Sequence, residues 1–173
     1  MSLLFESYVK SNKQAFIDKV KSISSKLLID PDWLMAVMYK ESRLNEKAVN
    51  SRGGATGLIQ FMPATAQSLG TTTAALKAMS NVEQLDYVYK YYKPYISKLN
   101  SYPDLYLATF FPAALGKADD YILQTSQLSA ATIADANPGI DLNKDRKITV
   151  GEFKEYCYKQ FDEATQERLK KKA

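Results

Sequence analysis

Residues 41–66 read ESRLNEKAVNSRGGATGLIQFMPATA, and the interpretation of the whole chain starts from this stretch. It begins with a glutamate at the end of an apolar helical segment, and the small, glycine-rich run that follows predicts a loop over 50–58. Glu41 shares one helix face with residues three, four and seven positions before it, namely Met38, Val37 and Leu34. Burial against such a face raises a carboxyl pKa, as a general acid at neutral pH requires.

An isolated glutamate at a helix end has a simpler interpretation, an ion pair at the surface with Lys40 or Arg43. Glutamates are rarely buried, so periodicity alone favours that surface pair. The glycine-rich loop after Glu41 would let a polymer backbone approach closely, and a resemblance to a known family, carried by the residues from 41 to 66, favours the buried acid.

The apolar spacing along the chain predicts a mainly α protein, and no β-alternation of useful length is present. Asp30 and Pro31 form a helix-start signal, an N-cap carboxylate followed by proline at the first helical position. Pro112 predicts a kink or an early end of its helix. The expected helices cover residues 6–28, 31–44, a short stretch after Pro63, 81–99, 104–116 and 149–170, with a linking loop over 126–140.

The composition excludes several kinds of chemistry. The 173 residues contain no histidine and one cysteine, Cys157, so imidazole catalysis, zinc hydrolysis and internal disulfides are poor hypotheses. Carboxylates are then the best candidates for acid/base work. The net charge of +4 indicates no nucleic-acid surface, and no apolar run is long enough to span a membrane. The opening residues 1–6 lack the pattern of a signal peptide.

The stretch from Asp32 to Gly70 resembles the transglycosylase domain of the soluble lytic transglycosylases, relatives of goose-type lysozymes. The resemblance rests on Glu41-Ser42, on the run Ser51 to Pro63 that contains Gly-Leu-Ile-Gln, and on Ala64-Thr65-Ala66. Ile59 replaces the methionine usual in that block. The resemblance implies a lysozyme-like transglycosylase fold.

The resemblance also implies a reaction, cleavage of the bond between N-acetylmuramic acid and N-acetylglucosamine in peptidoglycan. Glu41 would protonate the leaving oxygen and then take the proton of the sugar's own 6-hydroxyl, giving a 1,6-anhydro end. One carboxylate would then suffice where most glycosidases use two. Ser51, Gln60 and Met62 would line the sugar subsites, and Ser42 would cap or orient the acid. The simpler roles are a loop serine, a helix-cap glutamine and a core methionine.

The segment Leu107 to Gly116 departs from the family, which carries Ala-Tyr-Asn-Ala-Gly there. Phe110 and Phe111 stand where the polar pair is expected; they could stack on a sugar but cannot hydrogen-bond to it. A tyrosine from elsewhere, Tyr121 or one of the stripe from Tyr87 to Tyr95, is expected to substitute. A hydrolytic muramidase of the same fold is therefore the nearest alternative. A domain without turnover, either glycan-binding or structural in a virion or envelope, is a further one.

Residues 141–152 match the EF-hand calcium-loop pattern. The expected ligands are the side chains of Asp141, Asn143, Asp145, Thr149 and Glu152 and the carbonyl of Lys147. Arg146 replaces the usual glycine at position six, so it must adopt a positive φ and bring a charge near the cation. The simpler interpretation is that Thr149 and Glu152 form a capping box, and both roles can hold together.

The entering helix of this calcium loop is expected to be short or absent, as in a single dockerin-like half-hand with a structural calcium ion. We expect residues 1–125 to form the transglycosylase domain and residues 126–173 to add a linker, the calcium loop and a final helix packed on it. No organic cofactor is expected. The expected partner is the glycan strand of peptidoglycan, bound by a monomer. The expected location is the bacterial envelope or periplasm, the exterior, or a phage virion.

Overall fold

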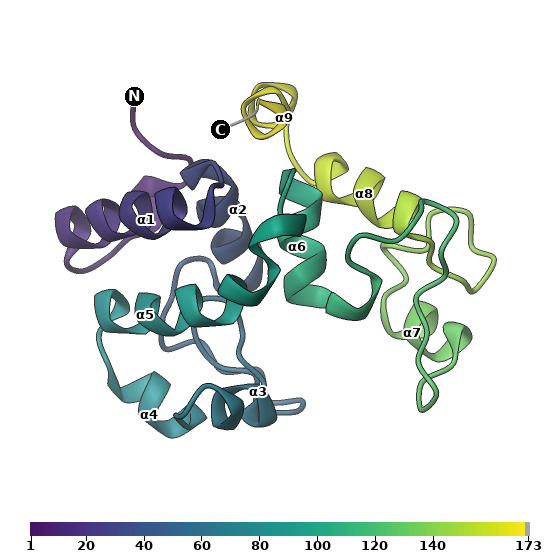
Figure 1. The fold of residues 1–173 in the computed structure, drawn as a ribbon, viewed down its shortest axis with the longest axis horizontal. Coiled ribbons are helices and arrows are strands. Elements are labelled where there is room, and N and C mark those ends of the chain that lie inside the picture. The colour runs from purple at the N-terminus through teal and green to yellow at the C-terminus, as the bar shows by residue number, and fades with distance from the viewer. Residues whose placement is uncertain (172–173) are drawn as a thin grey trace. The chain divides into compact units, whose positions relative to one another are not determined.

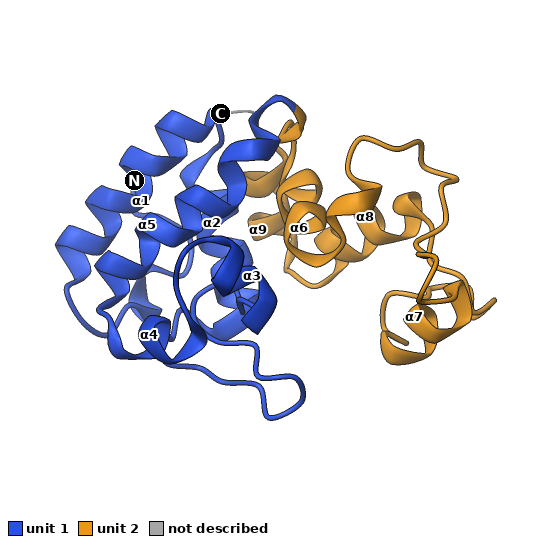
Figure 2. Cartoon of the chain, turned by 60° about the horizontal axis from the view of Figure 1, so that its bottom comes forward, with its two compact units in different colours: residues 1–97, 173 blue, residues 98–172 orange. Residues whose placement is uncertain are grey.

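The computed structural model describes residues 1–171 and is mainly helical, with isolated β-bridges instead of strands over that range. This confirms the mainly α class. The chain divides into two compact units, residues 1–97 and the part from Lys98 onward (Figure 2). None of the described helices is long and apolar enough to cross a bilayer.

The first unit is built around α1, which packs against both α2 and α5 (Figure 1). Its core consists of side chains that these helices bury completely or almost completely, among them Phe16, Val20, Leu34 and Leu85. The elements of this unit are η1 (Glu6–Tyr8), α1 (Lys13–Leu27), α2 (Pro31–Ser42), α3 (Pro63–Ser68), α4 (Thr73–Ala78), α5 (Asn81–Tyr92) and η2 (Lys93–Lys98), which reaches the boundary.

Local signals explain where these helices begin. The Asp30 carboxylate accepts from the Asp32 amide at 2.9 Å and Pro31 opens α2, as predicted. The helix expected from residue 6 begins only at Lys13, because Asn12 is left-handed with φ 52°. Helix α4 was not expected from the sequence; its N-cap is the Thr72 hydroxyl.

The second unit contains α6 (Tyr102–Phe110), η3 (Pro112–Ala114), α7 (Ala130–Ala136), α8 (Val150–Lys159) and α9 (Glu163–Lys170). Pro112 ends α6 early, as predicted. Two expectations are wrong. The expected loop over 126–140 contains α7, capped by Ser129, and the expected helix over 149–170 is broken before Asp162, which caps α9.

The boundary between the units differs from the division after residue 125 that the sequence suggested. Helix α6 packs against α8, and α8 packs against α9. Residues 98–125 therefore belong with the calcium-loop region in one compact unit.

The glycine-rich segment after α2, residues 48–62, folds as a narrow meander. Thr56 and Phe61 exchange backbone hydrogen bonds at 2.9 and 2.8 Å, and Val49 forms a bridge to Thr56 on its other side. The side chain of Gln84 on α5 has no exposed surface and forms hydrogen bonds that hold this meander in place. Its Oε1 accepts from the Leu58 amide at 2.6 Å, and its Nε2 donates to the carbonyls of Glu46 and Leu76.

Gly57 is required for the Gln84 contact. It has φ +88°, and a Cβ atom there would lie 2.5 Å from Oε1 of the Gln84 side-chain amide, a group that three hydrogen bonds hold in place. We expect Gly57→Ala to lower the free energy of unfolding by about 3 kcal/mol, from backbone strain and lost hydrogen bonds. Urea denaturation measures this loss.

Gly70→Ala is the matched control, because Gly70 has φ +83° but nothing within 4 Å of its Cβ position. It should lose only the strain of the positive φ, about 1 kcal/mol. Equal losses for the two variants would contradict the role given to the Gln84 contact.

Candidate functional site

Glu41 lies in the last turn of α2, beside the meander. Leu34, Val37 and Met38, which share its helix face, have no exposed surface, and Glu41 itself is half-buried. Burial raises the pKa of the Glu41 carboxyl from its usual 4.5 to about 7. At neutral pH this carboxyl can therefore both hold and release a proton.

Ser42, expected to cap or orient the acid, is buried and turned toward the meander. Its hydroxyl oxygen lies 3.1 Å from the Met38 carbonyl and 2.9 Å from the Leu58 carbonyl. It therefore joins the end of α2 to the meander. This contact fixes the backbone next to Glu41, and a contact of Ser42 with sugar stays a prediction.

Gln60, Ser51 and Met62 all belong to the meander. Gln60 has φ 57°, and its amide nitrogen donates to the carbonyls of Ala48 and Gly57 at 3.2 and 3.0 Å. It stabilises the tip of the meander and does not cap α3, whose N-cap is Met62. Ser51 is exposed. Met62 is 47% exposed, so it is not a core methionine, and it stays a candidate for contact with sugar.

Tyr91 on α5 is the tyrosine of the Tyr87–Tyr95 stripe that interacts with the acid. Its ring lies edge-on to Phe61 of the meander and next to Tyr95, with centroids 6.5 and 6.1 Å away. Burial, then the neighbouring Tyr95 and Glu41, raise the pKa of its hydroxyl. The Tyr91 hydroxyl therefore stays protonated and can donate a hydrogen bond. The helical spacing of the stripe could not single it out.

Phe110 and Phe111, at the end of α6, are half-buried in the second unit. The Phe110 ring stacks on Phe153 of α8, with centroids 5.4 Å apart and planes 12° apart. Both residues also line a pocket of about 230 Å³ together with residues of α7 such as Ile133. Their contact with sugar stays a prediction.

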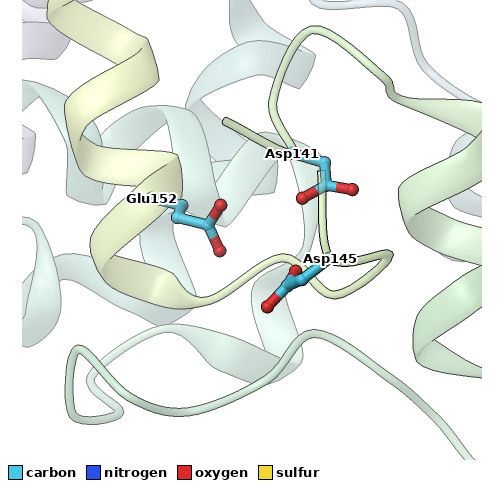
Figure 3. Close-up of side chains that lie close together, drawn as sticks. All are labelled: Asp141, Asp145 and Glu152. Carbon is cyan, nitrogen blue, oxygen red and sulfur yellow. The ribbon is translucent and has the colours of Figure 1, made fainter. Parts of the chain in front are cut away.

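Three acidic side chains of the loop over residues 141–152 lie close together in the second unit. Figure 3 shows Glu152 projecting from α8 toward Asp141 and Asp145, and oxygen atoms of all three lie within 4.8 Å of one another. Asp141 is 4% exposed, and its Oδ1 has no hydrogen-bond partner. A buried carboxylate oxygen without a partner is costly, so a cation fits this donor set.

The other expected ligands have contacts within the loop. The side chain of Asn143 contacts Asp145, whose amide donates to Asn143 Oδ1 at 3.2 Å. Lys147 donates its amide to Asp145. Thr149 and Glu152 form the reciprocal capping box of α8, so that interpretation is confirmed.

Arg146 adopts the expected positive φ, 63°. Its guanidinium forms two hydrogen bonds with the Asp135 carboxylate on α7, at 3.1 and 2.6 Å. Asp135 thus offsets the charge that we expected near the cation. The entering helix is also present, because α7 precedes the loop, although it has only seven residues.

The loop over residues 141–152 pairs with a short segment of the same unit. The Leu123 amide donates to the Ile148 carbonyl at 2.8 Å, the Val150 amide donates to Tyr121, and Ile122 forms an antiparallel bridge with Thr149. Residues 121–123 thus hold the loop around Ile148 and Thr149 by backbone pairing, a feature that the loop pattern alone did not reveal.

A half-buried glutamate at a helix end, followed by a glycine-rich meander on a mainly helical scaffold, is consistent with a lysozyme-like transglycosylase fold. The comparison with known families agrees: residues 18–102 match the model of the Transglycosylase SLT domain. The matched stretch includes Glu41, the meander and all of α5. It supports a glycan-cleaving enzyme of the lytic transglycosylase kind, acting on peptidoglycan in the bacterial envelope.

The raised pKa of Glu41 should make folding stability depend on pH. Between about pH 4.5 and 7 the unfolded chain ionises Glu41 while the folded chain keeps it protonated, so stability falls as pH rises. The shift from 4.5 to about 7 corresponds to a loss of at most about 3 kcal/mol. Glu41→Gln removes the ionisable group. Its stability relative to the parent should increase from about pH 4 to about pH 8, measured by urea denaturation. A difference independent of pH would contradict the buried acid.

Proposed function

We propose that this protein is a peptidoglycan lytic transglycosylase with Glu41 as its single acid/base. The observation that carries the proposal is the half-buried Glu41, whose pKa is raised to about 7, next to the meander of residues 48–62. A pKa near the working pH suits a group that must first give a proton and later accept one.

The proposed reaction uses Glu41 twice. The protonated carboxyl gives its proton to the glycosidic oxygen between N-acetylmuramic acid and N-acetylglucosamine, and that C–O bond breaks. The acetamido group of the muramic residue stabilises the electron-poor C1 carbon. The Glu41 carboxylate then takes the proton of the 6-hydroxyl as that oxygen bonds to C1, which regenerates the acid and leaves a 1,6-anhydro end.

We assign Tyr91 the place of the family's missing tyrosine. Its hydroxyl, which the Glu41 charge helps to keep protonated, can donate a hydrogen bond to the carboxylate or to the acetamido group. The edge-on contact with Phe61 ties Tyr91 to the meander, so it can transmit the position of the meander to the acid.

The test is mass spectrometry of digested peptidoglycan. The parent protein should release fragments with 1,6-anhydromuramic ends, and Glu41→Gln should lower the rate by at least about 10³-fold, because the proton donor is lost. The parent rate should fall as pH rises through about 7, since Glu41 then loses its proton. Tyr91→Phe, which removes only the hydroxyl, should lower kcat by a smaller factor.

Glu167→Gln, which changes an exposed glutamate on α9, is the matched control and should digest like the parent. Reducing ends in place of anhydro ends would assign hydrolysis, the muramidase reaction. Binding of peptidoglycan without any release of fragments would assign a binding or structural domain. Full activity of Glu41→Gln would refute the mechanism.

We also propose that the loop over residues 141–152 holds a structural calcium ion. Asp141, Asp145 and the bidentate carboxylate of Glu152 would supply charged oxygens, with Asn143, Thr149 and the Lys147 carbonyl completing the set. The buried Asp141 oxygen without a partner supports the proposal. The ion would join the loop to α8 and would take no part in the reaction.

Calcium should raise the melting temperature of the parent protein above its value in a chelator. At a concentration 100 times the Kd the gain is about 2.7 kcal/mol. Glu152→Gln keeps a side chain that can serve the capping box but loses the charge, so its shift should disappear. Glu155→Gln, one turn along α8 and paired with Lys159, should keep the shift. No shift in the parent would refute the calcium site.

A further inference from the structure

The first unit contains a pocket whose lining does not include Glu41. It has a volume of about 420 Å³, within the usual range of small-molecule sites, and is lined by polar residues of two segments. These are Tyr8, Lys10 and Ser11 from the start of the chain and Arg43, Asn45 and Glu46 from the turn after α2. Arg43 follows Ser42, the last residue of α2, and has a left-handed backbone with φ 55°, so it belongs to the turn after the helix.

Two buried side chains of α5 hold the two segments that form the walls of the pocket, residues 8–11 and 43–46. Asn81, 2% exposed, donates to the Ser11 carbonyl at 2.9 Å and accepts from the Asn12 side chain. Gln84, one turn later, donates to the Glu46 carbonyl at 3.0 Å. Both walls are therefore anchored to the same helix. A pocket held in this way is preformed, which lowers the entropy cost of binding a ligand.

Arg43 is fixed in place without a carboxylate. Its guanidinium lies 4.4 Å from the centre of the Tyr39 ring, and that ring stacks on Phe5 with centroids 3.9 Å apart. Among the described residues, neither Arg43 nor Lys10 forms a salt bridge. The pKa of nearby Lys40 is lowered by burial and by Arg43. This side of the pocket thus carries positive charge that an anionic ligand would balance.

The pocket also contains a negatively charged side chain. Glu46 lines the same pocket and forms no salt bridge among the residues described, and the side chains of Tyr8, Ser11 and Asn45 add neutral hydrogen-bonding groups. A guanidinium and an ammonium beside a carboxylate complement a ligand that carries both a carboxylate and an amino group. Sugars of the glycan strand lack that combination, and amino acids have it.

We propose that this pocket binds the peptide portion of peptidoglycan, with Lys10 and Arg43 on a carboxylate and Glu46 on an amino group. The inference rests on the proposed function for the choice of peptidoglycan. It adds a second contact with the cell wall, between the start of the chain and the turn that follows α2. Residues 8–11 lie outside the stretch that matches the family model, so the pocket combines matched and unmatched parts of the chain.

The test titrates the full chain carrying Glu41→Gln with N-acetyl-L-alanyl-γ-D-glutamyl-L-lysine, followed by NMR. The peptide should bind and perturb the amides of residues 8–11 and 43–46. Lys10→Glu should weaken binding at least about tenfold, because it replaces an attraction by a repulsion. Lys21→Glu, which makes the same charge change at an exposed site on α1, should bind like the parent. Amidating both carboxylates of the peptide should weaken binding as Lys10→Glu does.

No binding at millimolar peptide, or equal affinity for the Lys10→Glu and Lys21→Glu proteins, would overturn the inference. Both readouts use a chain without its acid, so they do not depend on turnover. If the peptide fails to bind while the parent still releases anhydro fragments, only this inference fails. If the peptide binds but the parent releases nothing, the proposed reaction fails and the peptide site stands.

Discussion

The arrangement of the first unit depends on the buried side-chain amide of Gln84. One carboxamide accepts from the meander at Leu58 and donates to the turn after α2 and to the end of α4. Leaving any of these groups unpaired in the interior would be costly, so the three segments keep their places together. Gly57 makes the contact possible, since a larger residue would occupy the space of the amide. The position of Glu41 follows, because Ser42 bonds to the carbonyl of the same Leu58.

Much of the fold could be predicted from local signals. The cap at Asp30, the proline that ends α6 and the buried face of α2 depend on neighbours in sequence, and the structure confirms them. Left-handed Asn12 and the break before Asp162 were missed, because an apolar period continues across a backbone interruption without a visible change. Helix α7 was missed because a short, alanine-rich helix in polar surroundings shows little periodicity.

In the candidate sites too, some residues could be predicted from the sequence and others could not. The spacing of residues predicted the apolar face that Glu41 shares and the clustering of the acidic loop side chains, and the family resemblance selected Glu41 as the acid, while the roles of both sites stay predictions. Gln84 and Asp135 were missed and Tyr91 was not singled out from its stripe, because each interacts with a residue distant in sequence and a single chain does not reveal such pairs. The charge of Arg146 was noticed from the sequence, but its bidentate pair with Asp135 needed the position of α7.

The short pairing between residues 121–123 and the calcium loop has a consequence for how a cation would be bound. Paired EF-hands share a small sheet, through which filling one loop helps to fill the other. Here Leu123 and Ile148 close that edge within the unit, and the described residues present a single acidic cluster. Occupancy would follow a simple hyperbolic saturation curve with a Hill coefficient of one. With the proposed calcium ion bound, such a loop would serve as a permanent clamp and would be poorly suited to act as a threshold sensor of rising calcium.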